Sequence, residues 1–200
     1  ATDATPEEVQ SLFKRSRIIG KRFKIVHVRA GREITEVTTF RAGHESTKTA
    51  DNRNRRNKQD AASNQQGMLL RDNVYGSLRE DALRRDFTVN ALYYSVDGFN
   101  VLDYTEATKD LDARQLRIIG DAELRYAEDP VRILRAVRLA AKLNVSIEPH
   151  TAAAIQPAGK LLQQVAPARL FDEMNKFFLS GYGQRTLALL RDYHLFEVLF

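Results

Sequence analysis

The segment Gly67–Tyr94, GMLLRDNVYGSLREDALRRDFTVNALYY, is the most informative part of the chain because its pattern changes from helical to extended within one short stretch. The charged triplet Arg84–Asp86 leads into Phe87–Asn90 and then into the apolar run Ala91–Tyr94. Polar groups therefore crowd a junction between a helix and a strand, and such a junction is suited to holding a phosphorylated ligand.

On both sides of this segment, the sequence predicts an α+β head, with a mixed or antiparallel sheet, followed by an all-α region. The pattern changes near Gly120, so we expect a head over residues 1–119 and a helical region over 120–200. The expected helices cover residues 5–14, 78–90, 129–143, 151–155, 167–179 and 185–193. The expected hairpins join 22–28 to 33–40 and 92–96 to 99–102.

Composition limits the class of protein. The 200 residues are 43% hydrophobic, without an apolar run long enough to span a bilayer, so we expect no membrane partner. The chain has no cysteine and no apolar signal segment, which favours a cytoplasmic location. A net charge of +5 and a pI near 9.5 suit a polyanionic partner, although a mixed surface of both signs is the simpler explanation.

Residues 42–66 contain no Leu, Ile, Val or large aromatic residue, which predicts a mobile loop. This segment contains a basic cluster, Arg53, Arg55, Arg56 and Lys58. The cluster could contact an RNA backbone, or its charges could simply be solvated.

The histidines are scattered, without the spacing of a metal site, and the chain has no Walker phosphate loop and no GxGxxG. Carboxylates remain as candidates for chemistry. Glu36 stands out because it lies within a β-branched strand beside Ile34 and Thr38, where an acid is disfavoured unless it is exposed or used. The simpler interpretation is a glutamate on the wet face of an edge strand.

The helix that begins at Asp129-Pro130 carries an arginine at every third position, Arg132, Arg135 and Arg138. An adjacent Arg and Asp offer a donor and an acceptor to the edge of a base, and such a site rejects a wrong base because polar groups stay unpaired. Ordinary ion pairing within the helix, involving Glu128, Asp129 and Arg132, is the competing explanation.

Taken together, three segments resemble the class II nucleotidyltransferases, the family of bacterial poly(A) polymerases and CCA-adding enzymes. Residues 36–41, EVTTFR, resemble the strand that carries the third catalytic carboxylate. Residues 84–90, RRDFTVN, resemble the motif for the triphosphate and ribose, and residues 128–138, EDPVRILRAVR, resemble the neck helix that reads the base. Two further segments, 18–28 and 70–76, are similar to the poly(A) polymerase branch, which makes CCA addition to tRNA the second choice.

The resemblance implies that an RNA 3′-hydroxyl attacks the α-phosphate of ATP, with two Mg²⁺ ions held by carboxylates including Glu36. It also implies that Arg84 and Arg85 hold the triphosphate, and that Asp129 with Arg132 reads the adenine. Asp86 would contact the ribose. The full set of implied nucleotide-binding residues is Arg84, Arg85, Asp86, Asn90, Glu128, Asp129, Arg132, Arg135 and Arg138. The implied partners are RNA 3′ ends and ATP, with RNA-decay or other RNA-binding proteins as further candidates.

Two departures from the family pattern bear on these expectations. The paired Asp-x-Asp of the family should stand just before Ala1, so two metal ligands are expected outside this sequence, and the apolar ending 194–200 suggests a continuation at the other end as well. At Glu106 and Ala107 the family has glycines, which leaves a turn or hinge there in question. The rival from another class is a non-catalytic nucleotide- or RNA-binding module.

Overall fold

The structure is a computed structural model that describes residues 1–20, 23–42, 61–63, 69–72 and 74–200. The chain divides into two compact units, Ala1–Arg84 and Arg85–Phe200. The expected mobile loop 42–66 and the basic cluster within it lie largely outside the described residues, although Ala61–Ser63 forms a short strand. In the described part of the chain, no helix has the length and apolar character needed to cross a membrane.

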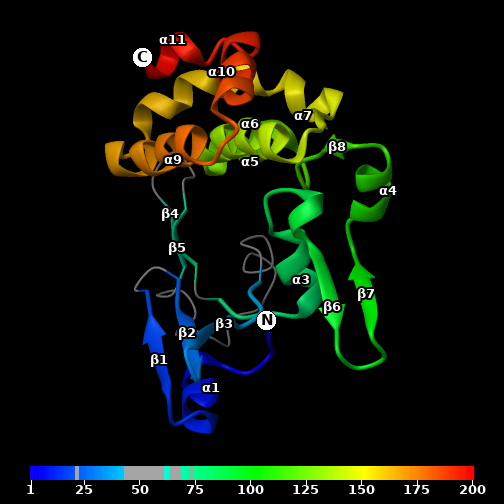
Figure 1. Ribbon diagram of the computed structural model, residues 1–200, viewed down its shortest axis with the longest axis vertical. Helices are drawn as coiled ribbons and strands as arrows, with labels where there is room; N and C mark the ends of the chain where they lie inside the picture. Colours follow the sequence, from blue (N-terminus) through cyan, green and yellow to red (C-terminus); the bar gives the residue numbers. More distant parts are fainter. Residues whose placement is uncertain (21–22, 43–60, 64–68, 73) are drawn as a thin grey trace, which may run out of the picture. The chain divides into compact units, whose positions relative to one another are not determined.

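The first unit combines short helices with antiparallel strands (Figure 1). Its elements are α1 (Pro6–Leu12), β1 (Ser16–Ile19), β2 (Ile25–Ala30), β3 (Glu33–Val37), β4 (Ala61–Ser63), β5 (Leu69–Asp72) and α3 (Leu78–Leu83). Strands β1, β2 and β3 form an antiparallel sheet in that order, and β4 pairs with β5. The first predicted hairpin is confirmed as β2 and β3, whereas β1 was not predicted.

Helix α1 begins with a capping box, as the Thr-Pro-Glu-Glu sequence predicts. The Glu8 amide donates to the Thr5 hydroxyl at 3.3 Å, and the Thr5 amide donates to the Glu8 carboxylate at 2.7 Å. The helix ends at Leu12, two residues before the expected Lys14. Within this helix Val9 is buried, whereas Leu12 and the following Phe13 are exposed.

Helix α3 is shorter than predicted, because it ends at Leu83 and not at Asn90. The second unit starts with an extended segment in which the buried Phe87 pairs with Ile118. The Thr88 amide donates to the Arg117 carbonyl at 3.0 Å, and the Ile119 amide donates to the Asp86 carbonyl at 2.9 Å, so the backbone here bonds to a distant segment before a short 3₁₀ turn begins at Thr88.

The second unit places a hairpin before a group of helices (Figure 1). Its strands are β6 (Leu92–Ser95), β7 (Asn100–Asp103), β8 (Gln115–Leu116) and β9 (Ser146–Ile147). Its helices are the 3₁₀ turn η2 (Thr88–Asn90), α4 (Ala107–Asp112), α5 (Ala122–Glu128), α6 (Val131–Leu143), α7 (Pro149–Ala153), α8 (Ile155–Ala158), the 3₁₀ turn η3 (Gly159–Gln164), α9 (Pro167–Leu179), α10 (Gly183–Asp192) and α11 (Phe196–Leu199). The second predicted hairpin is confirmed as β6 and β7, and the α+β class followed by an all-α region is confirmed.

Helix α6 lies at the centre of the second unit and packs against α9 and α10. Ile133, Leu134 and Val137 on α6 are fully buried, and they share a core with Phe177 on α9 and Leu190 on α10. This packing fixes the rotation of α6, so the arginines on its other positions are directed toward defined neighbours.

Candidate functional site

The predicted site residues of the second unit are gathered around the start of α6. Its three arginines each contact a different element, because positions three apart on a helix are offset around its axis. Arg132 contacts α5, Arg135 contacts the segment before η2, and Arg138 contacts α9.

Asp86 lies in a buried polar network with Arg135 and Asn90. Arg135 Nε donates to Asp86 Oδ2 at 2.6 Å, and Asn90 Nδ2 donates to Oδ1 at 2.9 Å. The Phe87 amide also donates to Oδ1, at 2.9 Å. Burial acts to raise the pKa of Asp86, but the Arg135 charge and these hydrogen bonds outweigh it and hold the pKa below its usual range. The structure thus brings three predicted residues together around one ionised carboxylate.

Arg85 is held against Tyr93 on β6. Its guanidinium lies 4.8 Å from the centre of the Tyr93 ring, and Nε donates to the Tyr93 hydroxyl at 2.8 Å. Nη1 donates to the Asn90 carbonyl at 3.0 Å, so Arg85 is fixed beside the Asp86 network. Tyr93 was not singled out from the sequence as a partner of Arg85.

Glu128 at the end of α5 binds two arginines. Arg125 Nη1 lies 2.7 Å and Arg132 Nη1 lies 2.8 Å from Glu128 Oε2. Burial is the main cause that lowers the pKa of Arg125, followed by the Arg132 charge, whereas Glu128 acts in the opposite direction. The predicted helical ion pair between Glu128 and Arg132 is therefore present. Arg125 was missed, although its spacing three residues before Glu128 is a signal for such a pair.

The Arg132 side chain keeps donors that no protein group uses. It is buried, and Nη1 also donates to the Arg125 carbonyl at 2.8 Å. Among the described residues, every hydrogen bond of this guanidinium uses Nη1, so Nε and Nη2 remain for a ligand. A ligand edge with an acceptor atom fits this geometry.

Asp129 does not pair with Arg132 through its side chain. Its Oδ2 lies 2.9 Å from Nη2 of Arg169 on α9, and its Oδ1 accepts a hydrogen bond from the Val131 amide at 3.3 Å. An ionised carboxylate has about four lone-pair positions, so Asp129 can accept a further bond. Arg169 was missed, because nothing in the sequence links two residues 40 positions apart.

Arg138, the last predicted arginine of α6, pairs with the buried Glu173 of α9 at 2.9 Å. Lys176 contacts the same carboxylate at 2.8 Å. Burial acts to raise the pKa of Glu173, but the two cations and their hydrogen bonds lower it. Arg138 thus joins α6 to α9.

In the first unit, Arg84 is held by the buried Asp81 one helical turn earlier, with Nε 3.1 Å from Oδ1. The same Oδ1 accepts a hydrogen bond from the Arg41 amide at 3.1 Å. Arg84 belongs to the first unit and Arg85 to the second.

Glu36 lies on β3, with its side chain 65% exposed, opposite His27 of β2. The His27 Nε2 and Glu36 Oε1 atoms are 3.4 Å apart. Glu36 supplies the oxygen ligand that Mg²⁺ prefers, but the described residues contain no cluster of three or more His, Asp or Glu that could hold a metal ion. These residues therefore provide one suitable ligand and do not complete a magnesium site.

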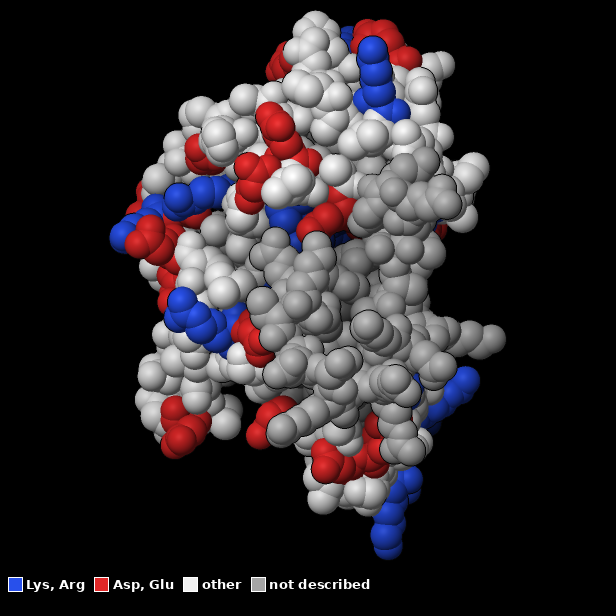
Figure 2. Space-filling model, turned by 180° about the vertical axis from the view of Figure 1, so that it is seen from behind, with Lys and Arg blue, Asp and Glu red and all other residues white. Residues whose placement is uncertain are grey.

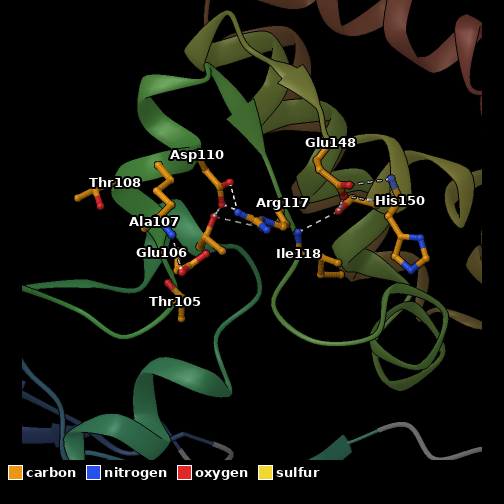
Figure 3. A network of polar contacts seen from close by, with 12 residues as sticks. Thr105, Glu106, Ala107, Thr108, Asp110, Arg117, Ile118, Glu148 and His150 are labelled. Carbon is orange, nitrogen blue, oxygen red and sulfur yellow. Dashed lines mark hydrogen bonds and ion pairs between the residues drawn. The ribbon is translucent and has the colours of Figure 1, made fainter.

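The segment that departs from the family's glycines forms a tight turn before α4 (Figure 3). Glu106 takes a left-handed backbone conformation with φ of 59°, which glycine adopts more easily. The Asp103 carboxylate accepts bonds from the amides of Ala107 and Thr108 at 3.0 and 2.9 Å. Burial acts to raise the Asp103 pKa, but these backbone bonds dominate and lower it to about 2.

A second network stabilises the region after this turn (Figure 3). The buried Asp110 pairs with Arg117, and Thr88 donates its hydroxyl hydrogen to Asp110 at 2.7 Å. The Asp110 hydrogen bond raises the pKa of Arg117. Next to Arg117 in the chain, the Ile118 amide donates to the Thr151 hydroxyl at 3.1 Å, and this hydroxyl donates to Glu148 at 2.8 Å. These contacts link the turn to the helices that follow β9.

Comparison with known proteins gives two family matches. A family described as "Poly A polymerase head domain" matches residues 1–117, and one described as "Probable RNA and SrmB- binding site of polymerase A" matches residues 144–200.

Curated relatives are similar over the whole chain. "Poly(A) polymerase I" of Escherichia coli O157:H7 is 51% identical over 199 residues, which are 100% of this chain and 41% of that protein. "Poly(A) polymerase I" of Haemophilus influenzae is 49% identical, over 100% of this chain and 43% of that protein. The "CCA-adding enzyme" of Leuconostoc citreum is 35% identical, over 94% of this chain and 42% of that protein. The chain thus spans about two-fifths of the length of these relatives.

Solved structures of similar fold include a CCA-adding enzyme and a tRNA nucleotidyltransferase. The Bacillus stearothermophilus CCA-adding enzyme in complex with CTP has a TM-score of 0.77 and 28% identity, over 96% of this chain and 42% of that chain. A tRNA nucleotidyltransferase complexed with a primer tRNA and an incoming ATP analogue has a TM-score of 0.72 and 27% identity, over 97% of this chain and 50% of that chain.

A head-domain match over more than half of the sequence, together with about 50% identity to poly(A) polymerases I, places the chain in a known group. The chain belongs to the poly(A) polymerase family of nucleotidyltransferases, in which the CCA-adding enzymes are its more distant relatives.

Proposed function

We propose that this chain is part of an enzyme that transfers AMP from ATP to RNA 3′ ends without a template. The observation that carries the proposal is the arrangement at the start of α6. Asp129 is held by Arg169 and Arg132 is held by Glu128, so an acceptor and a donor three residues apart in the sequence are each fixed before a ligand binds. Such preorganisation reduces the entropy lost on binding.

The donor and acceptor match the polar edge of adenine, whose amino group donates and whose ring nitrogen accepts. Nε or Nη2 of Arg132 would donate to the ring nitrogen, and Asp129 would accept from the amino group. Cytosine presents the same order of donor and acceptor. The pattern therefore supports ATP or CTP over GTP or UTP, and the choice between the first two depends on where Asp129 is held.

The remaining predicted residues divide into two groups. Arg84 and Arg85 are proposed to bind the triphosphate, and Asp86, fixed by Arg135 and Asn90, the ribose hydroxyls. Glu128 and Arg138 are proposed to position α6 without contacting the nucleotide.

Glu36 is proposed as one ligand of catalytic Mg²⁺, which when bound would neutralise charge on the phosphate oxygens. Its exposure supports this role, since an exposed carboxylate on a strand is accessible to a ligand. Further ligands would have to come from outside the described residues.

RNA contact is proposed for two parts of the chain. Residues 144–200 match a family described by RNA and SrmB binding, and this description supports RNA and a protein such as SrmB as partners. The basic residues at 53, 55, 56 and 58 are proposed as additional RNA contacts on their charge alone. Both substrates of this reaction, RNA and ATP, are abundant in the cytoplasm, the location we propose.

Primer extension tests the proposal. A labelled RNA primer is incubated with magnesium and each single nucleotide, using this chain and a polypeptide extended to the length of its relatives. Long tails with ATP alone support AMP transfer, whereas addition of C and A confined to tRNA-like ends supports the CCA-adding alternative. RNA binding without extension by either polypeptide supports a non-catalytic binding module.

The variant Arg132→Ala tests the base-reading site. We expect it to relax or abolish the preference for ATP, because an unpaired donor no longer penalises the wrong base. Unchanged selectivity among the four nucleotides would remove Arg132 from this role.

A further inference from the structure

One face of the β1–β2–β3 sheet carries a block of positive charge. Arg17 stands directly opposite His27 in the register of β1 and β2. Just before β1, Arg15 lies opposite Arg29, whose amide donates to the Arg15 carbonyl at 2.8 Å. Residues two apart on a strand share a face, so His27 and Arg29 point to the same side of the sheet. Three arginines and a histidine therefore occupy neighbouring positions.

This block lines a shallow groove of about 760 Å³ on the sheet face. The exposed Ile34 of β3 and Ile19 of β1 supply its apolar part. The groove lies entirely within the first unit.

The positive charges in the groove are not neutralised by the protein. In the described part of the chain, Arg15, Arg17 and Arg29 form no ion pair, and Arg29 Nε donates to the Gly31 carbonyl at 3.3 Å. Like charges directly opposite each other on paired strands are destabilising by roughly 0.2–1 kcal/mol. The fold therefore accepts a small cost that a bound anion would remove.

Several arginines of the second unit behave differently. Arg117, Arg135 and Arg138 each reach a carboxylate, as do Arg132 and Arg169. On the face drawn in Figure 2, positive and negative side chains of the described residues are interspersed. A local block of unpaired arginines is thus an exception to the mixed surface.

Glu36 is not a lining residue of the groove, but it lies directly opposite the lining residue His27. His27 lies between Arg17 and Glu36, because β2 is the central strand of the sheet. A phosphodiester strand that contacts Arg29 and then Arg17 would end close to Glu36.

We propose that this groove binds the backbone phosphates of the RNA strand whose 3′ end is extended. This inference rests on the proposed function only for the polarity of the RNA strand, that is, for placing its 3′ end near Glu36. The arginines lie on two neighbouring strands, which are about 5 Å apart, and residues on the same face of one strand are about 7 Å apart. These spacings suit contacts with successive phosphates of one RNA strand. Arg side chains bind phosphate through paired hydrogen bonds, and Ile19 and Ile34 offer apolar contact to the sugars and bases.

The test measures RNA affinity against salt concentration for the polypeptide extended to the length of its relatives. Arg17→Gln/Arg29→Gln removes two charges while keeping polar side chains of moderate size. Each lost phosphate contact lowers the magnitude of the slope of log K against log salt by about 0.7 for single-stranded nucleic acid, so we expect a decrease of about 1.4. The KM for RNA should rise while the KM for ATP stays unchanged.

The matched control is Lys14→Gln/Arg32→Gln. Both residues are exposed, lie in the same unit, and carry the same total charge, but neither lines the groove. The control should leave the salt slope unchanged. Arg17→Lys/Arg29→Lys should retain most of the slope, and circular dichroism compares the fold of all variants.

An unchanged salt slope in Arg17→Gln/Arg29→Gln overturns the inference, as does a rise in the KM for ATP alone, which would place a nucleotide triphosphate in the groove. An equal decrease in the control also overturns it, because the effect would then reflect total charge. Equilibrium binding does not depend on catalysis. Failure of the wild type to extend RNA would therefore refute the proposed function without touching this result.

Discussion

Asp86 and Arg135 are separated by 49 residues in the sequence, yet the Arg135 Nε donates to the Asp86 carboxylate at 2.6 Å. The contact joins the motif before η2 to the neck helix α6, so two segments that resemble different family motifs share one ion pair. Because Asp86 is largely buried, removing either partner would leave a buried charge unpaired, which destabilises the folded state.

The ionisation of Asp86 should make stability depend on acidic pH. Its pKa is lowered in the folded state, so its contribution is complete above the unfolded pKa of about 3.9 and is lost as the pH falls through the lower folded pKa. We expect Asp86→Asn to be less stable than the wild type at pH 7, with the difference shrinking below about pH 4. Urea denaturation at several pH values measures this, and a difference that stays constant with pH would contradict it.

Arg169 should influence the choice of nucleotide through Asp129. In Arg169→Ala the Asp129 carboxylate loses the group that holds it at 2.9 Å. We expect the ratio of kcat/KM for ATP to that for CTP to fall roughly tenfold, which corresponds to about 1.4 kcal/mol. Arg169→Lys, which keeps the charge, should have a smaller effect. Equal losses for both nucleotides would indicate a purely structural role.

Two cations on one carboxylate should differ in their effect on stability. Arg138 and Lys176 both bind the buried Glu173, but the Lys176 side chain is 51% exposed and that of Arg138 is 18% exposed. We expect Arg138→Ala to lower the free energy of unfolding by about 2–3 kcal/mol, and Lys176→Ala to lower it by less than about 1 kcal/mol. Chemical denaturation compares the two variants, and a larger loss for Lys176→Ala would reverse the assignment.

The left-handed backbone at Glu106 predicts a stabilising substitution. A non-glycine residue in this conformation costs about 1 kcal/mol, and the exposed Lys109 pair offsets only part of that cost. We expect Glu106→Gly to raise the free energy of unfolding by about 0.5 kcal/mol, and Tm by about 1–2 °C. Glu106→Ala keeps the strain and loses the pair, so it should not stabilise; equal Tm gains in both variants would exclude this explanation.

Local signals predicted the long helices well. Pro130 and Pro167 stand at helix starts, where proline is favoured, and the apolar periodicity behind each carries through to Leu143 and Leu179. The Asp97-Gly98 turn likewise located the second hairpin.

Tertiary contacts explain the features of the structure that the sequence did not predict. The helix expected over 78–90 stops at Leu83 because Phe87 is drawn into an extended pairing with Ile118, 31 residues further on. Local propensity does not contain that contact. The same holds for Asp129, for which the sequence suggested neighbours on its own helix and the structure supplies Arg169 from α9. The sequence therefore predicted which residues belong to the site, but it did not predict which side chains contact them.

The spacing of the three α6 arginines has a consequence for how this helix tolerates change over evolutionary time. Each is paired to a different element, and an inserted or deleted residue would turn everything beyond it by about 100° around the axis. An indel before Arg135 would misdirect two pairs at once, while point substitutions remove one. Length variation should therefore be excluded from α6 far more strictly than replacement of any single side chain.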